Sequence, residues 1–202
     1  MRKYFIAGDK LFCFNAKCCT SSFTRSIIEV HHPDIWYNLN HKIHFPYGKT
    51  VHEIEQLHQY APMRVNPDRP AALLMRDPVA RFRSAAGFLH ISNSIDEVLD
   101  IMINETGAAI KNDEGLLFGA RKPVAADIHL LKQSRFLHDD HVEDLKIFKM
   151  PDQIDECAEW LGLPTPMMHK NETSGPKPNL TAEQIEKIKH YYRKDIELWE
   201  SL

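Results

Sequence analysis

Short apolar runs alternate along the chain with amphipathic segments, without an internal repeat or a low-complexity tract. The runs 10–15 and 71–75 have the length of buried strands, and residues 145–150 alternate apolar and polar side chains as a strand does. Residues 3–6 predict a hairpin partner for the first run. This alternation predicts an α/β fold of one domain (1–202), with a mainly parallel central sheet flanked by helices in three layers.

Between these runs, apolar positions recur at helical spacing. Ser94 followed by Glu97, and Thr181 followed by Gln184, have the spacing of capping boxes. Gly162 stands where the end of a helix favours glycine. The spacing predicts helices that begin near Thr20, Thr50, Pro78, Ser94, Asp127, Pro151 and Thr181.

The charge balance limits the partners of the chain. It has 25 Lys+Arg against 28 Asp+Glu and a net charge of −3, which favours neither nucleic acid nor an anionic membrane as a partner. No stretch approaches the ~20 apolar residues of a membrane span, so we expect a cytoplasmic protein with no membrane partner. Any anionic ligand must therefore be bound by a local group of cationic residues. The sequence shows no pattern that indicates the oligomeric state.

Three of the four cysteines lie within residues 13–19. Their spacing fits neither a disulfide framework nor a zinc pattern, so we expect a reducing compartment. A metal site made of Cys18 and Cys19 with His31 and His32 would need two adjacent cysteines on one tetrahedral ion, which is a poor geometry. No metal is expected.

Residues 12–22 predict a buried strand that runs directly into a turn and a helix. The free N–H groups at a helix N-terminus attract an anion, to which Lys17 adds charge and the following hydroxyls add donors. The alternative is that a hydroxyl only caps the helix while Lys17 is solvated. No glycine lies between Asp9 and Gly48, so a Walker A loop is absent and an ordinary ATPase or GTPase is disfavoured. The three hydroxyl residues are Thr20, Ser21 and Ser22.

Residues 73–85 predict a second strand-to-helix junction. Arg76 falls at the carboxyl end of a central strand, the rim where open α/β sheets bind ligands, and Ser84 lies two helical turns further on. Arginine binds phosphate oxygens in a fork, and serine donates to the same group. The alternative is a structural ion pair of Arg76 with Asp77 or another carboxylate.

Together, these two segments resemble the sulfotransferase superfamily. Residues 15–21 (NAKCCTS) are similar to the family's Pro-Lys-x-Gly-Thr/Ser-Thr/Ser turn, and residues 76–85 (RDPVARFRSA) follow its Arg-Asp-Pro-x-x-Arg-x-x-Ser stretch almost letter for letter. Residues 129–137 (HLLKQSRFL) resemble a His/x-x-Gln-x-x-Tyr/Phe-Leu segment of the carbohydrate-type members, and residues 191–202 resemble their closing helix.

The resemblance implies a P-loop-like sulfotransferase fold. With it, the small size and the lack of a membrane anchor lead us to expect a prokaryotic or viral cytosolic enzyme rather than a Golgi one. Such an enzyme moves a sulfuryl group from 3′-phosphoadenosine 5′-phosphosulfate (PAPS) to a hydroxyl of a carbohydrate or small molecule, and it releases adenosine 3′,5′-bisphosphate (PAP). Lys17 would also act in catalysis by stabilising the negative charge that accumulates on the leaving phosphate. The implied donor-binding residues are Lys17, Cys19, Thr20, Ser21 and Ser22 on the 5′ side, Arg76 and Ser84 at the 3′-phosphate, and Lys170 or Lys177 in a loop over the nucleotide.

Two positions depart from the family pattern. Ala16 replaces the proline before Lys17, and Cys19 replaces a glycine that lets the backbone approach phosphate closely. We expect Cys19 to fit if the turn is not left-handed there. For the general base, the resemblance points to a Glu or His soon after the first helix, and we favour His41 and then His44. The candidates in this window are Glu29, His31, His32, His41 and His44.

Two other functions remain open from the sequence. A small-molecule kinase with a degenerate loop would bind ATP with magnesium. A non-catalytic nucleotide-binding module would keep the fold and lose the chemistry, which the departures at Ala16 and Cys19 favour. The identity of the acceptor leaves no pattern in the sequence.

Overall fold

The structure is a computed structural model of the chain. It describes residues 4–13, 15–33, 69–104, 110–111, 113, 117–118, 124, 127, 129–138, 144–167 and 177–202. The helix expected near Thr50 lies outside these residues.

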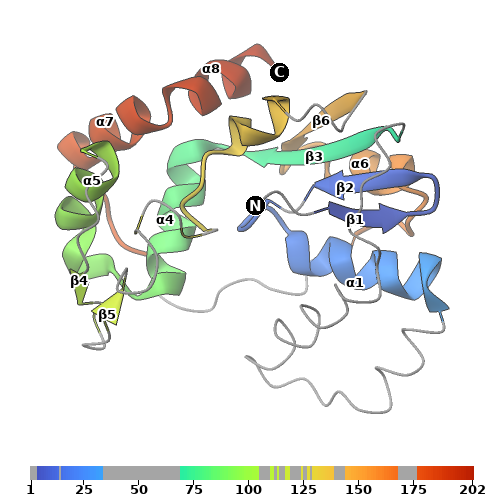
Figure 1. Cartoon of the computed structure of the whole chain (residues 1–202), viewed down its shortest axis with the longest axis horizontal. Helices are drawn as coiled ribbons and strands as arrows, with labels where there is room; N and C mark the ends of the chain where they lie inside the picture. The colour runs from blue at the N-terminus through green and yellow to red at the C-terminus, as the bar shows by residue number, and fades with distance from the viewer. Residues whose placement is uncertain are drawn as a thin grey trace.

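The described residues form an α/β fold built on a mixed four-stranded sheet (Figure 1). Its strand order is β1-β2-β3-β6, with β1 and β2 as an antiparallel hairpin and β2, β3 and β6 parallel. Gly8 turns the hairpin at a φ of 64°, which glycine adopts without steric cost. The expectations of an α/β fold and an opening hairpin are confirmed. The strands are β1 (Tyr4–Ala7), β2 (Lys10–Cys13), β3 (Ala71–Arg76) and β6 (Leu145–Met150), with a separate pair β4 (Ile110–Lys111) and β5 (Leu117–Phe118).

One face of the sheet is covered by α1 (Thr20–His31) and α6 (Ile154–Trp160). The rings of Phe12 and Phe23 stack there with centroids 4.7 Å apart. On the other face, the described cover is the 3-10 helix η3 (Gln133–His138), whose Phe136 meets Tyr4 edge to face at 5.9 Å. Apolar side chains on both faces of the central strands explain why 71–75 is a continuous apolar run.

A second apolar cluster lies beyond the carboxyl ends of β2 and β3, which point toward α4 (Figure 1). It joins the buried faces of α4 (Pro78–Leu89), α5 (Ile95–Ile103) and α7 (Ala182–Tyr191). Helix α8 (Arg193–Ser201) follows and contacts η3 and α4. The site described below lies where this helical cluster meets the strand ends.

Three expected helix features differ in the structure. The helix expected from Asp127 is a turn followed by η3, because the backbone amides of Gln133 and Ser134 donate to the Asp195 carboxylate instead of to carbonyls one turn earlier. Ser94 makes no capping bond and donates to Lys111 O at 3.2 Å. The final helix breaks at Tyr192, whose buried hydroxyl donates to Leu130 O at 2.6 Å. The capping box at Thr181 and the helix end at Gly162 (φ 70°) are confirmed.

Asp195 of α8 fixes the start of η3. Its carboxylate is fully buried and accepts from the backbone amides of Gln133 at 2.6 Å and Ser134 at 2.8 Å. A carboxylate at the N-terminus of a helical turn satisfies free N–H groups and complements their partial positive charge. The closing helix therefore positions Gln133.

Replacing this carboxylate should destabilise the fold. We expect Asp195→Ala to lower the free energy of unfolding by about 3 kcal/mol, because two buried amides lose their acceptor. Chemical denaturation measures the loss. Glu197→Ala, an exposed acidic residue of the same helix, should change it by less than about 0.5 kcal/mol. Equal losses in the two variants would contradict the role of Asp195.

Candidate functional site

The turn between β2 and α1 is tightly bonded to itself. Asn15 is fully buried, and its carbonyl accepts from the Cys18 amide at 3.2 Å and from the Thr20 hydroxyl at 2.5 Å. Lys17 and Cys19 both have left-handed backbones, with φ of 68° and 52°. Since the Thr20 hydroxyl proton is used within the turn, Thr20 offers an anion its backbone N–H in the first turn of α1.

The expectation for Cys19 is corrected by this geometry. The turn is left-handed at Cys19, a conformation that costs a residue with a Cβ about 1 kcal/mol and glycine almost nothing. The side chain is half-buried, with Sγ 4.0 Å from Met150 Sδ. Burial raises the pKa of Cys19 and raises that of Cys18 to about 11, so both are thiols at neutral pH.

Gln133 joins this turn to the end of β3. Its side-chain oxygen accepts from Asn15 Nδ2 at 2.8 Å, from the Arg76 amide at 3.1 Å and from Cys18 Sγ at 3.4 Å. Its side-chain amide donates to Arg76 O at 2.7 Å. Arg76 Nη1 in turn donates to Lys17 O at 3.3 Å. The two strand-to-helix junctions singled out from the sequence are therefore held side by side by one buried glutamine.

One face of α4 packs against the same turn. Arg81 is buried and its Nε donates to Ala16 O at 3.0 Å, while the Phe88 ring centroid lies 4.4 Å from Lys17 Nζ. Ser84 lies three residues after Arg81 and four before Phe88, so helical spacing places it on this face. Ser84 is itself buried. The structure thus brings Lys17, Arg76 and the Ser84 face of α4 to one location.

The site is strongly cationic. Burial, Arg76 and Lys177 together lower the pKa of Lys17 to about 8. Lys177 is held nearby because Arg83 Nε donates to Pro178 O at 2.7 Å. Burial and the charge of Arg81 also lower the pKa of Arg135, to about 10. These cations repel one another, and an anion bound among them would relieve that repulsion.

The alternative ion pair between Arg76 and Asp77 is not the arrangement seen. Asp77 caps α4, with Oδ1 accepting from the Ala80 amide at 2.6 Å. Arg76 instead contacts the backbone of the Lys17 turn. Its guanidinium therefore belongs to the cationic site.

The remaining expected site residues are placed as follows. Ser22 is buried in the first turn of α1, and Ser21 belongs to the same turn. His41, His44 and Lys170 lie outside the described residues, so their roles stay predictions. Sequence reasoning missed the contacts of Gln133 and Arg81, although both stand at non-x positions of the motifs quoted above.

No protein-family model, curated protein or solved structure matches this chain. The assignment of function therefore rests on the residues themselves. No helix in the described part of the chain is long and apolar enough to cross a membrane. The described residues also contain no group of three or more His, Cys, Asp or Glu side chains placed to hold a metal ion.

The Gln133 bridge makes a testable contribution to stability. We expect Gln133→Leu to lower the free energy of unfolding by about 2–4 kcal/mol, because the Asn15 amide and the Arg76 backbone lose buried partners. Gln153→Leu, which removes partly exposed bonds, is the matched control and should cost about 1 kcal/mol. Urea denaturation of the three proteins gives the comparison, and a Gln133→Leu protein as stable as Gln153→Leu would be inconsistent with the bridge.

Proposed function

We propose that this chain is a sulfotransferase that moves a sulfuryl group from PAPS to a hydroxyl of a carbohydrate or small molecule. The described fold supports a general α/β class, and the finer P-loop-like sulfotransferase fold is part of the proposal. The two junctions that carry the sequence resemblance lie together at the carboxyl ends of parallel strands. This rim is where open α/β sheets bind nucleotides.

The observation that carries the proposal is the environment of Lys17. Its ammonium is partly buried, neighbours Arg76 and Lys177, and has a lowered pKa. Cations held together in a partly buried site cost stability unless an anion binds among them. PAPS supplies two phosphate groups, one for each junction.

Each residue then has a defined task. Lys17 Nζ and the first-turn amides of α1 bind the 5′ side, where Lys17 neutralises charge that accumulates on the leaving phosphate oxygen. Arg76 and Ser84 bind the 3′-phosphate. Ser21, Ser22 and Lys170 complete the donor contacts, and PAP leaves as the product. The reaction as proposed needs no metal.

Titration with PAP beside ATP plus magnesium tests the donor site. We expect binding of PAP in preference to ATP, and a loss of about 10–100-fold in PAP affinity for Lys17→Ala and for Arg76→Ala, the equivalent of one charge-assisted hydrogen bond. Lys194→Ala on the exposed face of α8 is the control and should bind as the wild type does. Preference for ATP would favour a kinase, and unchanged affinity in both variants would refute the site.

The pH dependence of PAP binding tests Lys17 in particular. PAP phosphates are fully charged above about pH 7, so a fall in affinity above about pH 8 reports loss of the Lys17 proton. We expect affinity to fall by up to about tenfold per pH unit there, because only the ammonium attracts the phosphate. Lys17→Arg keeps its charge and should abolish the fall. The same lowered pKa means that Lys17 makes the fold more stable as pH rises from about 8 toward 10.5.

A fall in affinity that is the same in wild type and Lys17→Arg would assign the titration to another group. In that case the ammonium of Lys17 would not be the one that holds the phosphate.

A further inference from the structure

Asp127 and His129 form an oriented pair. Asp127 Oδ1 lies 2.8 Å from His129 Nδ1, and it also accepts from the His129 backbone amide at 2.8 Å. An ionised carboxylate only accepts hydrogen bonds, so Nδ1 of the neutral ring carries the proton and Nε2 carries the free lone pair. The Asp127 side chain is 26% exposed and the His129 side chain is 20% exposed, so the pair lies partly at the surface.

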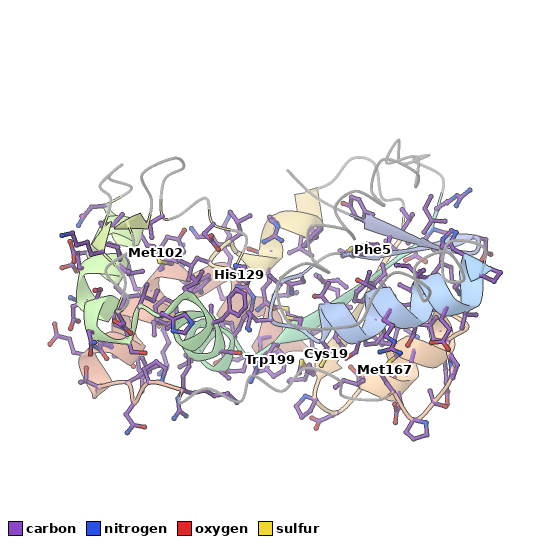
Figure 2. The ribbon with its side chains drawn as sticks, turned by 90° about the horizontal axis from the view of Figure 1, so that it is seen from below. Phe5, Cys19, Met102, His129, Met167 and Trp199 are labelled. Carbon is purple, nitrogen blue, oxygen red and sulfur yellow. The ribbon has the colours of Figure 1, made fainter. Side chains whose placement is uncertain are left out.

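This pair lies beside the cationic site. The His129 ring packs on Phe88 with centroids 4.6 Å apart, and Lys17 Nζ lies 4.4 Å from the centroid of the same phenyl ring. In Figure 2, His129 projects over α4 at the junction between the helical cluster and the sheet. The Phe88 ring of α4 therefore contacts both the His129 imidazole and the Lys17 ammonium.

The chain around His129 is fixed on its carboxyl side. Leu130 is fully buried and its carbonyl accepts from Tyr192, and Gln133 is held by Asp195 and by the strand-end contacts. A base must be held within hydrogen-bond reach of the proton it removes, and an anchored segment meets this need better than a free one.

We propose that His129 is the general base of the transfer, with Asp127 as its positioning residue. The inference rests on the proposed sulfuryl transfer. The acceptor oxygen forms a bond to sulfur, its proton passes to His129 Nε2, and the bond from sulfur to the bridging oxygen breaks with its electron pair on the 5′-phosphate. Lys17 stabilises the negative charge on the leaving phosphate, and Asp127 stabilises the imidazolium of His129. The proton then passes from His129 to water.

The competing assignments give different results. If His41 or His44 is the base, His129 contributes only local structure, as a turn bonded to Asp127 and packed on Phe88. Loss of a structural contact would lower stability or donor affinity. Loss of a base lowers the turnover number and leaves donor binding unchanged.

The experiment uses radiolabelled PAPS with a panel of sugars and phenols, and a parallel titration with PAP. We expect His129→Gln to lower kcat by about 100–10,000-fold while PAP affinity stays within about twofold of wild type. Asp127→Asn should lower kcat less than His129→Gln does. His190→Gln, an exposed histidine of α7, is the matched control and should leave both quantities unchanged.

The pH profile gives a second readout. Among the residues that the structure describes, the charged groups placed beside His129 are Asp127, in contact with it, and Lys17, which lies against the same Phe88 ring. His129→Gln should change the pH dependence of the rate, because only the wild type carries a base that must be deprotonated to act.

Three results would overturn the inference. The first is a His129→Gln rate within about threefold of wild type, with His41→Gln or His44→Gln inactive. The second is a loss of PAP affinity in His129→Gln that matches its loss of rate. The third is a wild-type protein that binds PAP but transfers sulfate to none of the acceptors. That result would refute the role of His129 as a base and would still support the donor-binding site. A wild-type protein that binds no PAP would instead refute the proposed function, on which this inference depends.

Discussion

The buried side chain of Gln133 is the contact on which the site depends. It bonds to the turn after β2 and to the end of β3, two segments that lie about 60 residues apart in the chain. Its own backbone is held by Asp195, which belongs to the closing helix α8. The first, middle and last parts of the described chain therefore meet at one residue.

Charge is the second constraint, and it opposes stability. Burial and the nearby Arg76 and Lys177 lower the pKa of Lys17, and burial with the charge of Arg81 lowers that of Arg135. The buried Asp195 is the counter-charge near Arg135. Repulsion among these cations lowers the free energy of unfolding, and it also favours the binding of an anion. Functional sites commonly lower stability in this way.

Much of this arrangement could be predicted from local sequence. The run 71–75 and the helix start at Pro78 gave the β3–α4 junction, and the capping box at Thr181 is present because its two bonds form within four residues. The helix expected from Asp127 was wrong, since a distant carboxylate, Asp195, decides the local structure there. Local periodicity carries no information about such a partner.

The residues of the candidate site also divide into those that local sequence predicts and those that only the folded structure reveals. Lys17 and Arg76 were found because residue type and position at strand ends point to phosphate chemistry. Neither the Gln133 bridge nor the Phe88 contact between Lys17 and His129 could be predicted, because each depends on residues brought together only by folding. The left-handed backbone of Cys19 was also missed, since a cysteine gives no sign of a position that suits glycine.

A crystal structure of the chain with bound PAP is the decisive measurement for the donor site. We expect the 5′-phosphate within about 3 Å of Lys17 Nζ and the Thr20 amide, and the 3′-phosphate on Arg76 with Ser84 beside it. PAP bound elsewhere, with both phosphates away from Lys17 and Arg76, would refute the proposed site.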